Sequence, residues 1–333
     1  MTETGPVSVD SLTKLSSNSN VDFRHVRKAE LHAHFNGSIP RAAISSIIQE
    51  RGLSQDLIPP VFIEPVASME AYLEPWKLYR QWPNDQAALD YYALAIASDF
   101  AKDGVVYAEL RHTAIEIAIT NSIPLSQALE RLLQALESAS TGEIDLRLIV
   151  GLSRWRASEE LLSDLYDALR NHRSNWRLVG VDLSGDELAP VHEGTERFFQ
   201  RVRSDLNLKV TIHAGEHGNA ANVRWAIEKC RADRVGHGIA VATDPTLLDL
   251  LLSSHCVVET CLTSNYLTKA IPSVAASPLK ALLDGGVPVV LGTDNCALHG
   301  KWLSDEYELA TLLVGAERAR QLARDSFRHR FGS

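Results

Sequence analysis

Short runs of hydrophobic residues alternate with longer amphipathic stretches from Lys28 to near the end of the chain. The short runs are rich in Val, Ile and Leu, which is typical of buried β-strands. The longer stretches carry apolar residues at i, i+3 and i+4, and this spacing predicts helices with one buried face. We expect eight strands, at Ala29–His34, Val105–Arg111, Leu146–Leu152, Leu178–Leu183, Lys209–His213, Arg234–His237, Val257–Cys261 and Val287–Leu291.

The stretches that connect the last seven strands are long enough for crossover helices. Repeated strand–helix units with right-handed crossovers can close into a (β/α)8 barrel, and closure removes both exposed edges of the sheet. We therefore predict an α/β fold of the TIM-barrel type. Helices are expected at Pro124–Ser138, Ser158–His172, Ala220–Cys230 and Pro245–Ser253.

The alternative fold is a doubly wound open sheet, which prefers a glycine-rich phosphate-binding turn after its first strand. The residues that follow the first predicted strand, Phe35-Asn36-Gly37-Ser38, contain no such turn. The barrel is thus the favoured interpretation.

The spacing between the first two strands is unusually long, at about 70 residues. It contains helical stretches near Ala42–Glu50, Met69–Tyr79 and Gln86–Lys102. An insertion at the carboxyl end of a barrel strand lies on the active face and can close over it. We expect a helical lid after strand 1.

The first 20 residues lack both the helical and the strand period, and half of them are Ser, Thr or Asn. Such a segment is typical of a mobile terminus. We predict a flexible N-terminal extension over residues 1–27 and one barrel domain over residues 28–333.

Composition and charge narrow the range of partners. With 45% hydrophobic and 23% charged residues, the 333-residue chain can bury a large core. The formal charge of −9 opposes binding to polyphosphate surfaces, so nucleic acid is not an expected partner. No apolar run approaches the ~20 residues that cross a bilayer, and the first 20 residues do not resemble a secretion signal, so no membrane association is expected.

The spacing of the cysteines indicates the redox state of the cellular compartment. There are four, Cys230, Cys256, Cys261 and Cys296, and they form no CxxC pair. We expect reduced thiols and a cytoplasmic protein. The oligomeric state stays open, a homo-oligomer included.

Polar residues stand at the carboxyl ends of several predicted strands. His32 and His34 end the first strand, and a period of two points both imidazoles into the barrel. His213 ends the fifth strand, His237 the sixth and Asp294 the eighth. Barrel enzymes place their catalytic groups at these carboxyl ends, so we expect the five side chains to meet.

Imidazole and carboxylate ligands without thiolates suit zinc and, less selectively, iron or cobalt. If the same residues only packed the interior, their gathering at one end of the barrel would have no explanation. Paired metals in barrel hydrolases usually need a carboxylated Lys at the end of the fourth strand, and Val181–Asp186 has none. We predict one Zn²⁺ per chain.

A bound metal lowers the pKa of water from ~15.7 to about 7, which an unassisted histidine base does not achieve. The metal is therefore expected to make the nucleophile, with His237 holding, deprotonating or charge-stabilising it. Glu216 follows His213 by three residues, next to glycines that let the backbone approach a ligand. A carboxyl group whose pKa is raised by a dry pocket could donate a proton to the substrate.

These residues lie in motifs that occur in order along most of the folded chain, from about Lys28 to Asp305. Through them the chain resembles the adenosine deaminase family, the metal-dependent purine deaminases of the amidohydrolase type. The motifs are Lys28–Ile39, Val105–Arg111, Gly180–Glu187, Thr211–Glu216, Arg234–Gly238, Cys261–Asn265 and Thr293-Asp294.

The resemblance implies hydrolytic removal of the 6-amino group, or of an N6-substituted amino group, from a purine nucleoside, nucleotide or related compound. It implies that Glu216 protonates ring N1 and that His237 orients the attacking hydroxide. The backbone of Gly185 would meet ring N3, and Asp182 would support the metal site. The zinc ligands it implies are His32, His34, His213 and Asp294.

Two positions depart from the adenosine-specific pattern. Asn36 stands where those enzymes carry an Asp that binds the ribose 5′-hydroxyl, which removes repulsion against a 5′-phosphate. The sequence there looks like the adenosine-deaminase-like branch that acts on N6-substituted AMP. Asn295 replaces the second of two paired acidic residues, the one that holds ring N7. An amide can donate N–H to that nitrogen but cannot carry charge or exchange a proton.

The lid offers further substrate contacts. Met69, Tyr72, Leu73 and Trp76 recur at three- and four-residue spacing and form one apolar helix face. Such a face commonly packs in a core, but in the family this region forms an apolar gate over the purine. We expect Tyr72, Leu73 and Trp76 to contact the substrate or its entrance.

Two other functions stay open at this point. A related amidohydrolase would keep the metal barrel and hydrolyse another C–N bond, an ester or a phosphate ester. A ligand-binding relative would keep the fold and have weak turnover. Release of ammonia from 6-aminopurines would distinguish the deaminase from the related amidohydrolase. Metal analysis with an activity screen would distinguish it from the ligand-binding relative.

Overall fold

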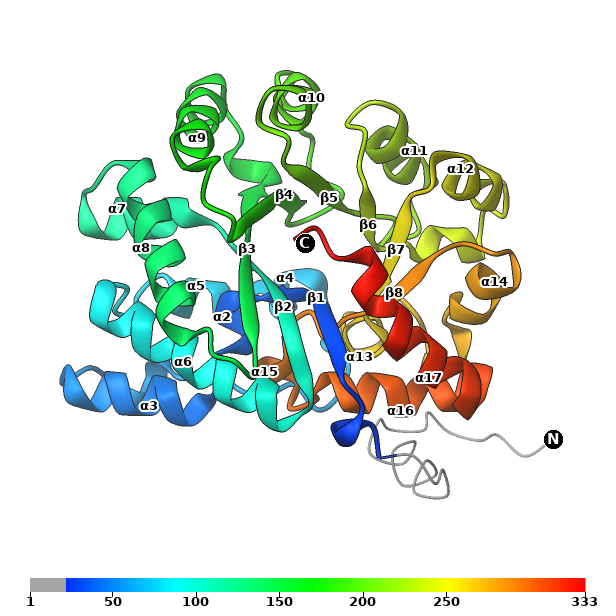
Figure 1. The fold of residues 1–333 in the computed structure, drawn as a ribbon, viewed down its shortest axis with the longest axis horizontal. Helices are drawn as coiled ribbons and strands as arrows, with labels where there is room; N and C mark the ends of the chain where they lie inside the picture. The colour runs from blue at the N-terminus through cyan, green and yellow to red at the C-terminus, as the bar shows by residue number, and fades with distance from the viewer. Residues whose placement is uncertain (1–21, 333) are drawn as a thin grey trace.

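The computed structural model describes residues 22–332. Its centre is an eight-stranded parallel sheet in which the strands pair in chain order (Figure 1). All the predicted strands are present, with ends that shift by one or two residues. They are β1 (Lys28–His34), β2 (Val105–His112), β3 (Asp145–Ser153), β4 (Leu178–Ser184), β5 (Lys209–Ala214), β6 (Arg234–His237), β7 (Val257–Thr260) and β8 (Val289–Leu291).

The segment that follows β8 closes the sheet onto β1. Asp294 forms an isolated parallel bridge with Ala33. Its backbone N–H donates to the carbonyl of His32 at 2.7 Å, and its carbonyl accepts the N–H of His34 at 2.7 Å. Closure thus places a predicted metal ligand directly beside the two histidines of β1. Together with the strand order, it confirms the predicted (β/α)8 barrel.

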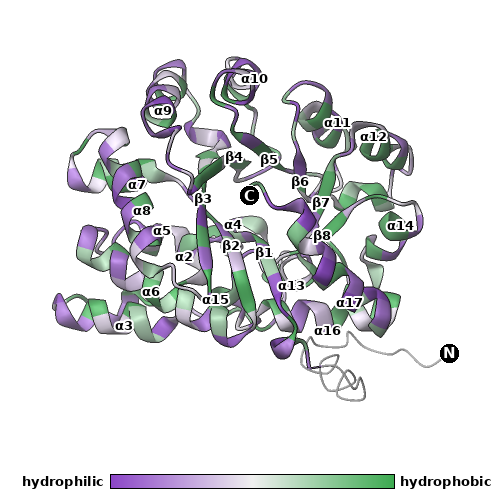
Figure 2. Cartoon of the chain, in the orientation of Figure 1, coloured by the Kyte–Doolittle hydropathy of each residue, from purple (hydrophilic) through white to green (hydrophobic). Residues whose placement is uncertain are grey.

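Helices surround the barrel on its outside. Figure 2 shows hydrophilic and hydrophobic residues alternating along these helices, and the apolar residues of α8, such as Leu129 and Leu132, are buried in the main core with Leu110 and Leu148 of the strands. The helices after β2 are α7 (Ala114–Asn121), α8 (Leu125–Ala139), α9 (Glu159–His172), α10 (Thr195–Leu206), α11 (Ala220–Glu228), α12 (Thr246–Ser254), α13 (Leu262–Leu267), α14 (Leu279–Asp284), α15 (Cys296–His299), α16 (Leu303–Val314) and α17 (Ala316–Asp325).

The long connection between β1 and β2 is helical, as predicted. The sequence pattern predicts a single helix over Met69–Tyr79, but the structure divides it into α4 and α5. Pro75 begins α5 because its ring fits the first turn of a helix and it has no N–H for an interior position. The helices of this insertion are α2 (Phe35–Ser38), α3 (Arg41–Glu50), α4 (Met69–Leu73), α5 (Pro75–Tyr79) and α6 (Gln86–Lys102).

Short 3-10 turns complete the architecture: η1 (Phe23–His25), η2 (Gln55–Leu57), η3 (Arg154–Arg156), η4 (Ile239–Ala242), η5 (Val274–Ala276) and η6 (Ser326–His329). Phe23 in η1 is buried and stacks on Tyr307 of α16, with ring centroids 5.5 Å apart. Residues 22–27 of the extension predicted over residues 1–27 are thus described and include η1, whereas residues 1–21 lie outside the described residues and their flexibility stays a prediction. Within residues 22–332, no helix combines the length and the apolar character needed to span a bilayer.

Candidate active site

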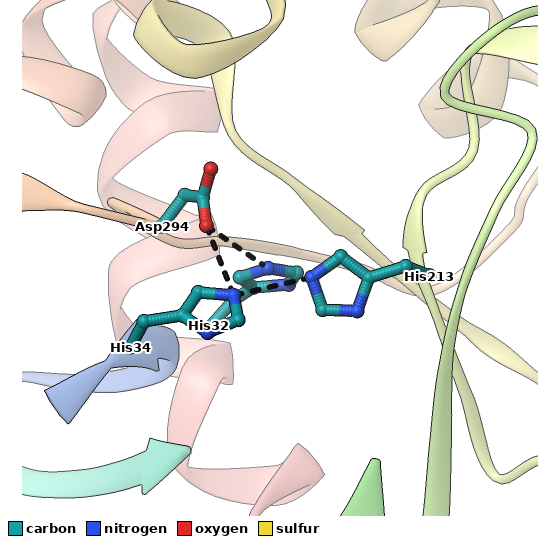
Figure 3. A group of neighbouring side chains, drawn as sticks. All are labelled: His32, His34, His213 and Asp294. Carbon is teal, nitrogen blue, oxygen red and sulfur yellow. Dashed lines mark hydrogen bonds and ion pairs between the residues drawn. The ribbon is translucent and has the colours of Figure 1, made fainter. Parts of the chain in front are cut away.

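The four predicted metal ligands converge at the carboxyl ends of the strands. One ligand atom from each of His32, His34, His213 and Asp294 lies within 4.8 Å of every other (Figure 3). Nε2 of His34 is 3.2 Å from Nε2 of His213 and 3.2 Å from Oδ1 of Asp294. The structure therefore brings together side chains from both ends of the barrel sequence.

Hydrogen bonds behind two of the imidazoles turn their Nε2 atoms inward. Nδ1 of His32 contacts Oε2 of Glu259 at 2.7 Å, and Nδ1 of His213 contacts Oδ1 of Asp182 at 3.0 Å. A carboxylate accepts the Nδ1 proton, so the Nε2 lone pair of each ring is left to bind a metal. Nε2 of His32 is buried and has no hydrogen-bond partner.

The protonation of the cluster also suits a cation. Burial lowers the pKa of the His32 imidazole well below its ordinary value, which keeps the ring neutral. Burial alone would raise the pKa of Asp294, but the neighbouring histidines, His34 first, outweigh it and hold that pKa well below its usual range. Three imidazole nitrogens and one ionised carboxylate oxygen form a donor set that fits a divalent metal such as zinc.

The backbone around the cluster is strained and closely packed. His237 and Asp294 have positive φ angles of 68° and 61°, which are uncommon for residues other than glycine and occur often at functional sites. A Cβ atom at Gly292 would lie 2.5 Å from Cβ of His32. Only glycine lets the end of β8 approach β1 closely enough to bring Asp294 beside the histidines.

His237 lies beside the metal cluster with a defined orientation. Its Nδ1 is 2.8 Å from Oδ1 of Asn265, and because an amide oxygen only accepts, Nδ1 carries the proton. Nε2 is then the free acceptor, and it lies 3.7 Å from Oε2 of Glu216. The two predicted proton-handling side chains therefore face each other across the site.

A cavity of about 290 Å³ opens above the metal cluster. Every residue that we expected to contact substrate lines it, and so does Asp182. Gly185 forms part of the cavity wall and has a positive φ of 98°. The expected substrate-contact residues in the lining are Asn36, Tyr72, Leu73, Trp76, Gly185 and Asn295.

The hydroxyl of Tyr72 connects the lid helix α4 to residues of the site. Its hydroxyl lies 2.8 Å from Nε2 of His299, 2.9 Å from Nδ2 of Asn295 and 3.3 Å from Oδ2 of Asp294. Burial raises the pKa of Tyr72 well above its ordinary value, so the hydroxyl keeps its proton. The apolar face of α4 is thus turned to the cavity and is not wholly packed against barrel helices.

Two residues that position the site were not assigned a role from the sequence. Glu259 orients His32, and Asn265 orients His237. Glu259 is a charged residue in the apolar run Val257–Cys261, and that interruption of the pattern was the available signal. Asn265 ends one of the family-like motifs, but its partner could not be read from the chain.

Comparisons with known proteins agree with this geometry. A sequence model of the adenosine deaminase family matches residues 27–332. The adenosine deaminase of Vibrio parahaemolyticus is 32% identical over 302 residues, which cover 88% of this chain and 89% of that protein. The adenosine deaminase of Erwinia tasmaniensis is 34% identical over 224 residues, 67% of this chain and 66% of that protein.

A solved structure is similar over almost the whole chain. It is the N6-mAMP deaminase of arabidopsis, which superimposes with a TM-score of 0.81 at 26% identity and covers 93% of this chain and 95% of that one. The likeness extends through both the barrel and the insertion that carries the lid helices.

Proposed function

This chain belongs to the adenosine deaminase family, and we propose that it is a zinc-dependent hydrolase that replaces the 6-amino group of a purine by oxygen and releases ammonia. The substrate is a nucleoside, a nucleotide or a related 6-aminopurine, with or without a substituent on N6. The observation that carries this proposal is the convergence of His32, His34, His213 and Asp294 beside His237 and Glu216 in one cavity.

One zinc ion per chain would be held by these three imidazoles and the Asp294 carboxylate. When bound, zinc lowers the pKa of water to about 7 and so supplies a nucleophile at neutral pH. Asp182 and Glu259 keep the imidazoles of His213 and His32 in the tautomer that can bind the ion.

His237 and Glu216 divide the proton transfers between them. Nε2 of His237, the free acceptor of that ring, holds the attacking water at C6 and accepts its proton. Glu216 in its acid form donates a proton to ring N1, which makes C6 more electrophilic. Addition of water at C6 and departure of the amino group as ammonia leave a 6-oxopurine.

Residues of the cavity wall hold the purine ring. The backbone of Gly185 faces ring N3, and the Asn295 amide faces ring N7. Tyr72, Leu73 and Trp76 cover the ring and exclude water from the reacting atoms. A cavity of about 290 Å³ is near the lower end of the range for small-molecule sites, which suits a single purine ring system and its sugar.

The substituents of the substrate are inferred from the cavity rim. Asn36 lines the cavity and is uncharged. The lack of a carboxylate at this position favours a substrate with a 5′-phosphate or another 5′ modification over adenosine. The similar arabidopsis structure is named for N6-mAMP, which is a compound of this kind.

We place this activity in the cytoplasm. Cys230, Cys256, Cys261 and Cys296 are all free and buried, as expected for thiols in a reducing compartment.

A substrate panel tests the proposal. Purified, zinc-analysed protein would be incubated with adenine, adenosine, AMP, N6-methyl-AMP and a 5′-thio nucleoside, and ultraviolet spectra and ammonia (methylamine for N6-methyl-AMP) would be recorded. We expect turnover of at least one compound, with a 5′-modified one preferred over adenosine. A clear preference for adenosine would refute the 5′ assignment, and no release from any compound would refute the deaminase.

A further inference from the structure

The C-terminal segment enters the barrel from the end opposite to the metal cluster. Figure 1 shows the C-terminal segment running in among the strands, and Phe331 lies close to Gly180 of β4 and Arg234 of β6. The N–H of Phe331 donates to Oε1 of Glu109 at 2.6 Å, and the N–H of Gly332 donates to the Tyr107 hydroxyl at 3.1 Å. The last described residues therefore lie at the amino-terminal mouth of the barrel.

The ring of Phe331 covers a buried arginine. The guanidinium carbon of Arg234 lies 3.4 Å from the centroid of that ring, and Arg234 is 1% exposed. Its Nη1 has no hydrogen-bond partner, although the side chain is paired with Glu109 and Glu259. An arginine in this setting depends on the aromatic face that excludes water from it.

Arg234 is connected to the metal cluster through Glu259. Its Nε is 3.0 Å from Oε1 of Glu259, while Oε2 of Glu259 contacts Nδ1 of His32 at 2.7 Å. Arg111 and the hydroxyl of Thr211 also bind Glu259, at 2.5 Å and 3.1 Å. The contacts run without a gap from Phe331 through Arg234 and Glu259 to His32.

The charged side chains that connect Phe331 with His32 are paired with opposite charges and buried away from water. Glu109 pairs with Arg234, Glu259 pairs with both Arg111 and Arg234, and all four side chains are nearly or fully buried. Paired buried charges keep one arrangement as long as each partner is held and water is excluded. Exposure of Arg234 would loosen one of the groups that fix the Glu259 carboxylate.

We propose that Phe331 is a plug that holds Arg234 and Glu259 in place and thereby tightens metal binding at His32. Glu259 is the positioning residue for His32, and Phe331 acts on it from the far end of the barrel. This inference rests on the proposed metal site. It assigns to the C-terminal segment a part in metal retention.

Metal affinity, measured without substrate, tests the plug. Zinc dissociation constants would be determined by competition with a chromophoric chelator, and the visible spectrum of the cobalt-substituted protein would report ligand geometry. Removal of an outer hydrogen-bond partner typically weakens metal binding by ~10–100-fold, which we expect for Glu259→Gln. Phe331 acts one contact further away, so Phe331→Ala should weaken zinc binding by roughly three- to tenfold and alter the cobalt spectrum.

The chain offers a matched control in Phe327. This half-buried phenylalanine packs at the same end of the barrel, but the guanidinium over its ring is that of Arg330, 5.7 Å from the centroid, whereas Arg234 lies over Phe331. Phe327→Ala should leave zinc affinity and the cobalt spectrum unchanged. Phe331→Leu fills the same apolar space without an aromatic face, so it serves if Phe331→Ala does not fold, and it should also weaken zinc binding.

The outcomes separate this inference from the proposed function. Equal zinc affinities for the Phe331 and Phe327 variants would overturn the plug, and unchanged affinity in Glu259→Gln would overturn the path to His32. Wild-type protein that binds no zinc would overturn both proposals. Absence of ammonia release with the expected order of zinc affinities would overturn the deaminase and leave the plug supported.

Discussion

The hydroxyl of Tyr72 lies 2.9 Å from Nδ2 of Asn295, which joins the lid helix α4 directly to the residue after Asp294, a proposed zinc ligand. The same hydroxyl also contacts His299 and Asp294, so one side chain links the lid with three residues of the site. A displacement of α4 away from the barrel would break these three contacts together.

The first prediction concerns Asn295. In the described site its Nδ2 is bound to Tyr72 and its Oδ1 has no partner. A carboxyl group could accept the Tyr72 proton and also exchange a proton with ring N7, whereas an amide cannot. We expect Asn295→Asp to raise turnover of a 6-aminopurine more than threefold, measured as kcat by ultraviolet absorbance. A change below about threefold, roughly 0.6 kcal/mol, would show that this residue does not limit the reaction.

The second prediction concerns Glu216. Replacement by Gln keeps the shape of the side chain but removes the proton that ring N1 would receive. General acid catalysis typically contributes ~10²–10⁴-fold, so Glu216→Gln should lower kcat by that factor. Zinc content, measured by mass spectrometry of the metal, should stay equal to wild type because Glu216 is not a ligand. Near-normal kcat with full zinc would remove Glu216 from the mechanism.

The third prediction concerns Asp182, which holds the His213 imidazole at 3.0 Å. Burial alone would raise the pKa of Asp182, but His213 and Arg111 outweigh it and lower that pKa, so the group is an ionised acceptor. Asp182→Asn should weaken zinc binding by ~10–100-fold in a chelator competition. Asn222→Asp, on a partly buried side chain that lies outside the cavity lining, provides a control. Equal zinc affinity in both variants would argue against the support role.

The fourth prediction concerns stability and pH. Burial raises the pKa of Glu306 from 4.5 to about 7, although its carboxyl accepts the N–H groups of Leu262 and Thr263. An acid with a higher pKa in the folded protein binds its proton preferentially there. Its contribution to the free energy of unfolding therefore decreases as the pH rises from about 4.5 to about 7.

Glu306→Gln imitates the protonated carboxyl at every pH. Relative to wild type, the variant should gain about 2 to 3 kcal/mol of unfolding free energy between pH 5 and pH 8, measured by urea unfolding. Glu130→Gln, on the exposed face of α8, should show no such trend. A parallel pH dependence of wild type and Glu306→Gln would refute the raised pKa.

The sequence predicted the barrel because the signals for its strands are local. Each short apolar run is bounded by polar residues, and the closing polar residue of several runs identifies the carboxyl end of the strand. This is why the sequence alone groups His32, His34, His213, His237 and Asp294.

Other features depend on contacts between distant segments. The pairing of Tyr72 with Asn295 joins residues 223 positions apart, and no periodicity reports it. Glu259 breaks an apolar strand pattern, but its partner His32 is visible only once the barrel is closed. The hydrophobic period over Met69–Tyr79 is that of one continuous helix, so it does not reveal the break before Pro75.

Release of ammonia before and after metal removal tests whether one zinc ion, held by the histidine and aspartate cluster, is required for deamination. Protein that turns over a 6-aminopurine would be stripped with a chelator and then titrated with zinc while ammonia is measured. Activity should disappear on stripping and return in full at one zinc per chain. Undiminished ammonia release by the metal-free protein would contradict this requirement for zinc.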